Sequence, residues 1–228
     1  MRRLSGKKLG RVGLILLAGT GLLALDACGP TKEAAPPPPV KIEIRAFGIP
    51  SAIVDYDVRG LKSGTERLYF DGWGTRQARY IHTKMLVMGL AQEENVLKID
   101  DGRWSYTIDL PKATGIRQPN PVLQAHAADV GHDGKLVLKD EVMTDMGGRK
   151  AGSNNILGHT CRVWVVPATH TSYCLWKNIP LLTVMCDNDV EITTTAISIN
   201  ENVPVKDGIF KIPDSVTIRD AGPTPTTK

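Results

Sequence analysis

The 228-residue chain lacks the motifs of the common enzyme classes. It has no G-x-S-x-G nucleophile motif and no glycine-rich phosphate loop after a strand. A zinc hydrolase would need paired histidines with helical spacing beside an acid. No such pair occurs among the five histidines, which are His82, His126, His132, His159 and His170. We therefore predict a protein that is not an enzyme and needs no cofactor; catalysis by residues brought together only in space stays open.

A metal centre is also not predicted. Residues 129–140 (DVGHDGKLVLKD) have acids at positions 1, 5 and 12 of a calcium loop and a glycine at position 6. However, Gly131 occupies position 3, and Asp140 replaces the bidentate glutamate of position 12. These departures favour a glycine-rich turn over a calcium site.

A basic surplus is missing from most of the chain. The formal charge is +4, but residues 1–27 carry five of the 28 basic residues and one of the 24 acidic residues. The rest of the chain therefore has 23 of each and is formally neutral. Nucleic-acid binding needs a basic face that displaces counterions, so we expect no nucleic-acid partner.

The one long apolar run is too short to cross a membrane. Val12–Leu25 spans 14 residues after a basic stretch, whereas a membrane-spanning helix needs about 20. This pattern is typical of a secretory signal. The run ends Leu25-Asp26-Ala27-Cys28, which resembles a bacterial lipobox, so Cys28 is expected to be acylated and to become the mature N-terminus. An ordinary signal peptide with an incidental cysteine is the alternative.

The domain boundaries follow from composition. Residues 1–27 are predicted to be the signal peptide, and residues 28–40 (CGPTKEAAPPPPV) a Pro-rich tether that favours polyproline II. Residues 41–220 have the length of one folded domain, and residues 221–228 should be a frayed tail.

Strict polar–apolar alternation marks residues 95–110 (NVLKIDDGRWSYTIDL) as two strands joined by a turn at Asp101-Gly102. A two-residue turn there would place Ile99 opposite Trp104 and Leu97 opposite Tyr106. The apolar positions then share one face of the sheet: Leu97, Ile99, Trp104, Tyr106, Ile108 and Leu110. Aromatic residues on such a face are either core or ligand lining.

The fold class predicted from the remaining segments is β-rich α+β. Alternation at residues 52–58, 67–70, 76–87, 160–166, 172–176, 182–186 and 190–199 indicates further strands. Between residues 112 and 155 the alternation is lost, and a short helix is predicted over residues 136–146. We expect eight to eleven antiparallel strands and one or two helices.

Three cysteines remain after Cys28, and none forms a C-x-x-C pair. A three-residue turn centred on Pro180 would place Cys174 opposite Cys186 and allow a disulfide, whereas a two-residue turn at Lys177-Asn178 would not. Another pairing with Cys161, or three free thiols, is left open.

Two stretches resemble the LolA/LolB and LppX/LprG lipoprotein superfamily. One is the DGRWSY turn of residues 101–106, and the other is the ending, from Tyr173–Trp176 through Ile179-Pro180-Leu181 to NVPVKDGIFKIPDSVTI. The resemblance implies an open, curved antiparallel half-barrel whose apolar concave face is covered by helices and binds acyl chains such as palmitate. On that reading the ligand would contact Leu97, Ile99, Trp104, Tyr106, Ile108 and Trp176.

Two functions are compatible with these features. In the first, a lipid-anchored protein of the cell envelope holds an acyl chain or another apolar ligand in the concave face. In the second, the concavity is filled by the protein's own side chains, and the chain is a structural or interaction protein with an envelope partner. Gly29 after the acylated cysteine resembles lipoproteins sent to the outer membrane, so we expect the periplasmic side of that membrane.

Overall fold

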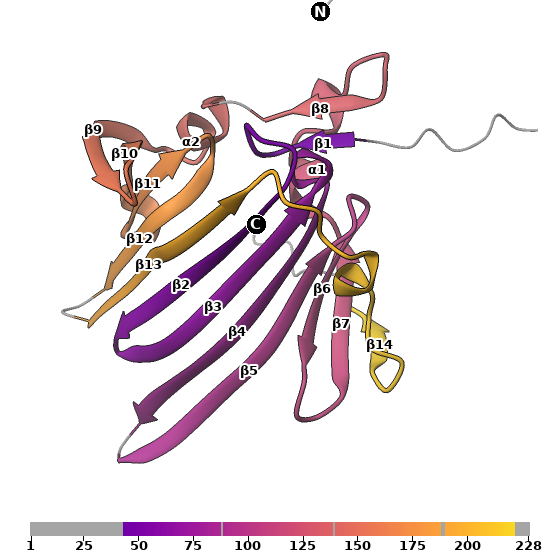
Figure 1. Cartoon of the computed structure of the whole chain (residues 1–228), viewed down its shortest axis with the longest axis vertical. Coiled ribbons are helices and arrows are strands. Elements are labelled where there is room, and N and C mark those ends of the chain that lie inside the picture. Colours follow the sequence, from indigo (N-terminus) through magenta and orange to yellow (C-terminus); the bar gives the residue numbers. More distant parts are fainter. Residues whose placement is uncertain (1–42, 88, 139, 188–189, 222–228) are drawn as a thin grey trace, which may run out of the picture. The chain divides into compact units, whose positions relative to one another are not determined.

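A long sheet dominates the computed structural model, which describes residues 43–87, 89–138, 140–187 and 190–221 (Figure 1). All of these residues belong to one compact unit. The predicted signal peptide, the tether with Cys28 and the tail beyond residue 221 lie outside the described residues. None of the described helices is long and apolar enough to span a membrane.

Twelve strands form the main sheet, in the order β14-β7-β6-β5-β4-β3-β2-β13-β12-β11-β10-β9. All neighbours are antiparallel except β14 and β7, and a separate parallel pair joins β1 to β8. The strands are β1 Glu43–Arg45, β2 Ala52–Gly60, β3 Lys62–Asp71, β4 Arg76–Val87, β5 Leu90–Asp100, β6 Trp104–Asp109, β7 Thr114–Pro119, β8 Lys135–Val137, β9 Arg149–Ile156, β10 His159–Val166, β11 Thr171–Trp176, β12 Ile179–Asp187, β13 Val190–Glu201 and β14 Thr217–Asp220.

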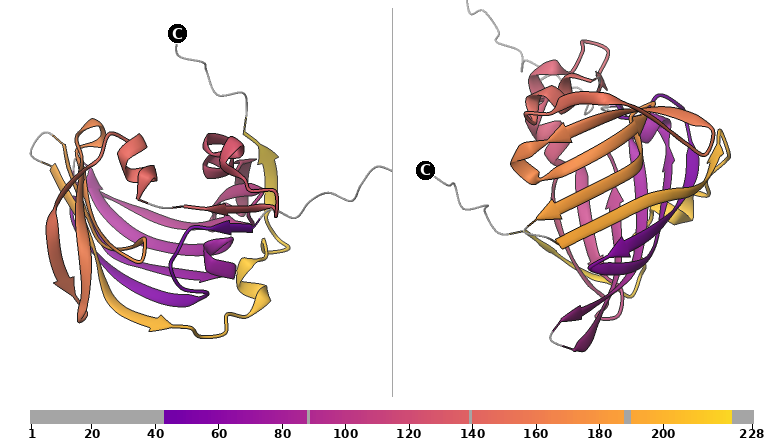
Figure 2. Two further views of the ribbon diagram at one scale, coloured as in Figure 1. Left: turned by 90° about the horizontal axis from the view of Figure 1, so that it is seen from above. Right: turned by 90° about the vertical axis from the view of Figure 1, so that its left-hand side faces the viewer.

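The sheet is curled but not closed. Its two helices, α1 Pro121–Ala125 and α2 Glu141–Asp145, lie with β1 and β8 at the open side of the curve (Figure 2, left). Short 3-10 turns cover Gly72–Gly74, Ala127–Asp129, Pro167–Thr169 and Asp207–Phe210. The predicted β-rich α+β half-barrel is confirmed.

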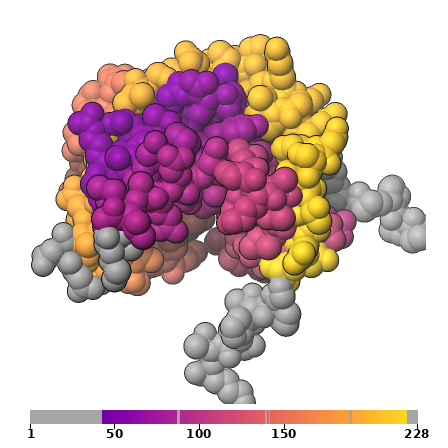
Figure 3. Space-filling view, turned by 90° about the horizontal axis from the view of Figure 1, so that it is seen from below, coloured from indigo at the N-terminus to yellow at the C-terminus, as the bar shows by residue number. Residues whose placement is uncertain are grey.

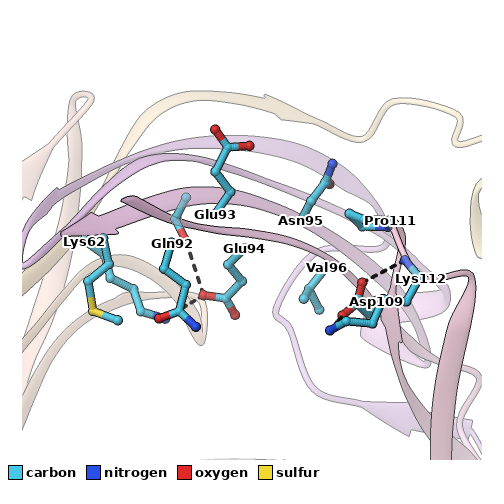
Figure 4. A pocket seen from close by; sticks show the side chains of 11 residues that line it. Lys62, Gln92, Glu93, Glu94, Asn95, Val96, Asp109, Pro111 and Lys112 are labelled. Atoms are coloured by element: carbon cyan, nitrogen blue, oxygen red, sulfur yellow. Dashed lines mark hydrogen bonds and ion pairs between the residues drawn. The ribbon is translucent and has the colours of Figure 1, made fainter. Parts of the chain in front are cut away.

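The pairing register assigns each side chain of β2–β6 to the concave or the convex face. Residues that lie opposite each other on neighbouring strands point to the same face. Figure 4 shows Glu94 and Val96 on the inner side of the arch and Glu93 and Asn95 on its outer side. The concave face therefore carries one row of side chains that runs through Tyr56, Glu66, Ile81, Val96 and Asp109.

Each face has its own apolar core. The concave cluster joins one side of β2 and β3 to β10–β13 and to the segment before β2. Its buried members are Ile49, Ala52, Val54, Tyr56, Leu68, Phe70, Cys161, Cys174, Ile179, Leu181 and Ala196. The alternation predicted for residues 52–58 is confirmed, because Ala52, Val54, Tyr56 and Val58 are all buried.

The convex cluster is covered by the C-terminal segment, which we define as residues 202–220. The buried sheet residues Ala78, Leu97, Ile99 and Ile108 pack with Phe210, and five further apolar residues of the segment, one leucine and three tyrosines surround them. In Figure 3 the segment (yellow) lies along the flank of the strands coloured magenta and pink. The chain thus uses its own last strand and loop to cover one side of its sheet.

The hairpin of residues 95–110 forms, but its register differs from the prediction by two residues. Ile99 lies opposite Tyr106 and Leu97 opposite Ile108. The turn is centred on Gly102-Arg103; Gly102 adopts a positive φ of +90°, and the Asp101 amide donates to the Trp104 carbonyl. The Asp101 carboxylate also accepts hydrogen bonds from the amides of Arg103 and Trp104, at 2.9 and 2.7 Å.

The region between residues 112 and 155 contains more strand than predicted. Strand β7 and all of β9 except its last residue fall inside it, and the expected helix of residues 136–146 is reduced to α2, preceded by the short strand β8. The prediction was wrong here because the side chains of β9 are exposed along its length, except for half-buried Ile156, so they carry no apolar alternation.

The predicted Cys174–Cys186 disulfide is wrong. Cys161 bonds Cys174 with the Cα atoms 5.2 Å apart, and Cys186 is exposed and free. The physical reason is the turn between β11 and β12: Lys177 and Asn178 both adopt positive φ, 49° and 64°, and form the two-residue turn that pairs Trp176 with Ile179. Cys174 then lies beside Leu182 rather than Cys186.

Candidate functional site

The concave face contains a cavity of about 410 Å³ near the ends of β3, β4 and β5, which we call the concave cavity. Its polar lining comes from Lys62, Thr83, Gln92, Glu94, Asp109 and Lys112, and its apolar lining from Met85, Val96 and Pro111. Glu93 and Asn95 border it but direct their side chains to the outer face (Figure 4).

A charged network forms the floor of the concave cavity. The Lys62 ammonium lies 2.5 Å from Glu94 Oε2, and the buried Thr83 hydroxyl donates to the same oxygen at 3.2 Å. The hydrogen bond from Lys62 is the main reason why the pKa of Glu94 is lowered. A second pair in the lining, Lys112 Nζ and Asp109 Oδ2, lies 2.6 Å apart. The cavity therefore offers fixed charges rather than an apolar wall.

Further polar groups continue across the concave face. Arg79 Nη1 donates to Glu66 Oε2 at 2.7 Å, and its guanidinium carbon lies 5.3 Å from the ring centroid of Tyr56. Burial raises the pKa of the Tyr56 hydroxyl to about 12. Burial also raises the pKa of Asp100, against a hydrogen bond from Ser105. An apolar ligand lying here would cover groups that it cannot hydrogen-bond.

The predicted ligand wall is not on the concave face, which corrects our expectation. Leu97, Ile99, Tyr106 and Ile108 share the convex face, where the C-terminal segment covers them. Alternation shows which residues share a face, but the direction of curvature depends on the whole sheet and cannot be read from one hairpin. Sequence reasoning found the apolar row and assigned it to the wrong side.

The two predicted tryptophans lie on different strands, β6 and β11, and neither belongs to the convex cluster. Trp104 stands beside the β5–β6 turn, with the guanidinium carbons of Arg103 and Arg117 at 5.6 and 4.7 Å from its ring centroid. Trp176 ends β11, between the His159 ring at 4.1 Å and Lys177 Nζ at 4.3 Å. Neither residue lines the concave cavity.

The residues of the concave cavity were not predicted as a site. Thr83 and Glu94 belong to strands whose polar positions are expected, from the sequence, to face solvent. Their pairing depends on the register between β4 and β5, which places Thr83 opposite Glu94. Only the count of polar residues along residues 76–96 could have indicated a polar inner face.

Exposed apolar side chains gather at one end of the sheet, where the hairpins β2–β3, β4–β5 and β12–β13 turn. Leu86 and Leu90 are 69% and 75% exposed, and Leu61, Met185 and Val190 are exposed nearby. The concave cavity opens at this end, since Lys62 and Met85 lie opposite each other at the start of β3 and the end of β4. Clustered exposed apolar residues mark interaction surfaces.

The last acid of the calcium-like loop, Asp140, forms ion pairs with basic side chains. Asp140 is held by both terminal nitrogens of Arg162 and lies 3.5 Å from Lys150 Nζ. Among the described residues no group of three or more His, Cys, Asp and Glu side chains could hold a metal ion.

No family model matches the sequence, and no curated protein matches it. Solved structures to which the chain is similar include an uncharacterised conserved protein of Thermus thermophilus, at 10% identity and a TM-score of 0.49, covering 78% of this chain and 93% of that one. A MucB structure has 12% identity and a TM-score of 0.40, and a Pseudomonas aeruginosa MucA/MucB complex 10% and 0.42.

This chain spans 60% of the length of each of these two MucB chains, and they cover 75% and 77% of it. Likenesses of this size carry no functional assignment. The resemblance to the LolA superfamily stays a prediction.

Proposed function

We propose that the protein is a non-catalytic, lipid-anchored protein of the cell envelope that binds a protein partner through its concave face. One observation carries this proposal: the apolar wall expected to hold an acyl chain is already buried under the C-terminal segment. The concave side is filled by the concave cluster at β2, β3 and β12 and carries charges of β3 that are paired with charges of β4 and β5. Of the two functions compatible with the sequence, the interaction protein fits this arrangement better.

The chemistry of the concave face supports a polypeptide partner. Lys62, Glu94, Asp109 and Lys112 present both signs of charge around a cavity with apolar patches. Charged groups in such positions fix the register of a partner and exclude wrong ones. The exposed leucines at the neighbouring hairpin ends add apolar area, which supplies affinity.

The acyl-chain alternative keeps one specific support. Met85, Val96 and Pro111 give the concave cavity an apolar side. A fatty-acid tail in the cavity would lie against the Lys62–Glu94 pair, which needs solvent or polar partners.

Cross-linking in intact cells tests the proposal. A photo-crosslinking amino acid at position 98, in place of the exposed concave residue Lys98, is expected to give one adduct whose mass increase is that of a protein. The same group at position 59, in place of the exposed convex residue Arg59, is the matched control and should not give that adduct.

Native mass spectrometry of the purified protein tests for a bound lipid, which would contradict the proposal. Co-purified lipid at one molecule per chain, retained by the wild type and lost on replacing Val96 by Asp, would contradict the interaction proposal and favour an acyl-chain carrier. We expect no lipid beyond the N-terminal anchor.

The lipid anchor is tested separately. Replacing Cys28 by Ala should abolish incorporation of labelled palmitate and leave residues 1–27 attached, because the thiol is both the acylation site and the processing signal. The variant should therefore migrate more slowly in a denaturing gel than the wild type. Palmitate labelling that persists in Cys28→Ala would place the lipid elsewhere, and Cys186→Ala is the control that should label normally.

A further inference from the structure

A second cavity, of about 590 Å³, lies on the convex face, beside the C-terminal segment and away from the concave cavity. We call it the convex groove. Polar and aromatic side chains form its floor, and Ile197 and Ile209 border it. The floor residues are Asp55, Thr65, Arg67, Tyr69, Tyr80, His82 and Asn95, with Ser198 at one side. Ligand pockets typically measure about 300–1,000 Å³, so the groove has the size of a binding site.

The register of the sheet builds the floor in two rows across the strands. Ser198, Asp55, Arg67 and Tyr80 lie opposite one another in sequence across β13, β2, β3 and β4. Thr65, His82 and Asn95 form the next row across β3, β4 and β5. These side chains belong to strands paired on both sides, so the floor is rigid.

The two walls come from irregular features of the chain. A register shift in β13 sets Ile197 apart from its neighbours, and this side chain is 55% exposed. A bulge of this kind redirects a side chain and is common beside functional sites. Ile209 is supplied by the turn Asp207–Phe210 of the C-terminal segment.

The charges of the groove are balanced within it. Arg67 Nε donates to one oxygen of Asp55, and the Ser198 hydroxyl donates to the other at 2.8 Å. One acid and one base of the convex face are thus paired with each other, so an ionic ligand gains little net attraction. A ligand without charge fits this floor better than an anion or a cation.

Several polar side chains of the floor make no side-chain hydrogen bond in the part of the chain that the structure describes. They are the imidazole of His82, the amide of Asn95 and the hydroxyls of Thr65 and Tyr80, whereas Asp55, Arg67 and Ser198 bond one another. A purely apolar ligand would cover these groups without satisfying them, which is costly. The ligand should therefore carry hydroxyl or amide groups.

The aromatic part of the floor selects for a ring with an apolar side. Tyr69 and Tyr80 meet edge to face, with ring centroids 5.9 Å apart, and both are only partly buried. A pyranose ring has C–H groups on its faces and hydroxyls around its rim. It can lie against an aromatic ring while its rim bonds the surrounding polar groups. A peptide strand has no free sheet edge to pair with in the groove, since β2, β3 and β4 are each paired on both sides.

We propose that the convex groove binds a neutral oligosaccharide, with a pyranose ring against the tyrosine pair and its hydroxyls bonded to the polar floor. This site is separate from the concave face and does not depend on the protein partner proposed above.

Calorimetric titration of the purified full-length protein, in a detergent without a sugar headgroup, tests the proposal. The two probes are chitotetraose, whose acetamido groups resemble those of a cell-wall glycan strand, and maltotetraose, which has none. We expect saturable binding of at least one of them, and the probe that binds identifies the source of the glycan. Replacing His82 by Ala should weaken binding several-fold, and replacing Tyr80 by Ala about tenfold.

The control is Lys84→Ala, because Lys84 lies two residues after His82 on the same face of β4 but outside the groove. It should bind as the wild type does. The Tyr80 side chain packs against the convex cluster, so Tyr80→Ala could fail to fold. His82 is exposed, so His82→Ala keeps the test valid in that case. Binding of neither oligosaccharide at millimolar concentration, or binding that His82→Ala and Tyr80→Ala leave unchanged, overturns the proposal.

Discussion

Truncation of the chain after Asn202 should abolish the cooperative unfolding transition of the domain. The deletion removes Val205, Ile209, Phe210, Ile212, Val216 and Ile218, which pack against the convex cluster or belong to it. Burial of six such side chains contributes on the order of 10 kcal/mol before the entropy cost of ordering the segment. The whole stability of a domain is about 5–15 kcal/mol, so the truncated chain should not fold. Thermal unfolding followed by circular dichroism measures this.

Two further variants make this prediction specific. Phe210→Asp places a carboxylate among Leu97, Ile99 and Ile108 and should destabilise the domain by several kcal/mol. Lys211→Asp changes the exposed neighbour and is the matched control, with little expected change. A truncated chain that still unfolds in one sharp transition would show that the C-terminal segment is dispensable.

Loss of the Cys161–Cys174 disulfide should lower the stability of the folded domain by about 3 kcal/mol. The bond closes a loop with a sequence separation of 13. Closing a loop of about that length lowers the conformational entropy of the unfolded chain and so raises its free energy by roughly 3 kcal/mol. For a chain of this size the melting temperature should fall by roughly 6–12 °C. The double variant Cys161→Ala/Cys174→Ala, and the wild type with a reductant, should both show the decrease.

Cys186→Ser provides the comparison, since that thiol is exposed and belongs to no disulfide. Its melting temperature should equal that of the wild type, and a reductant should lower it to the same extent. If the reductant left the wild-type melting temperature unchanged, the bond would contribute nothing to stability.

The hairpin of residues 95–110 shows how far the sequence can specify this fold. The predicted register was wrong by two residues, yet the faces were right: Leu97, Ile99 and Ile108 are buried together, while Lys98 and Thr107 are exposed. A side chain returns to the same face every second residue, so an error of two leaves the face unchanged. An error of one residue would have assigned every side chain to the opposite face.

The candidate site was harder to predict from the sequence, for a different reason. The inner and outer faces of a curved sheet have the same alternation, and which face curves inward depends on twist and on what covers each side. Here the cover of the convex face comes from Phe210 and its neighbours, more than 100 positions after Leu97 in the chain. The concave cavity, by contrast, depends on the register that brings Lys62, Thr83 and Glu94 together.

The cysteine pairing depended on one local choice. Positive φ at Lys177 and Asn178 selects the shorter turn, and this choice moves Cys186 away from Cys174 along the neighbouring strand. Lysine is an unusual residue at such a position, since positive φ favours Gly, Asn or Asp. The Lys177 carbonyl accepts a hydrogen bond from the Gly48 amide at 2.8 Å, so a distant segment helps to hold the turn.

The position of the C-terminal segment imposes an order on folding, because β4, β5 and β6 precede in the chain the residues that cover them. If the chain is exported N-terminus first, as the predicted secretory signal implies, these strands reach the far side of the membrane before their cover does. Until residues 205–218 emerge, Leu97, Ile99 and Ile108 face water from a nearly complete sheet. Incompletely covered sheets of this kind aggregate readily. On that route the last steps of export would determine the yield, and a chaperone that shields this surface should act late, on a chain that is almost fully exported.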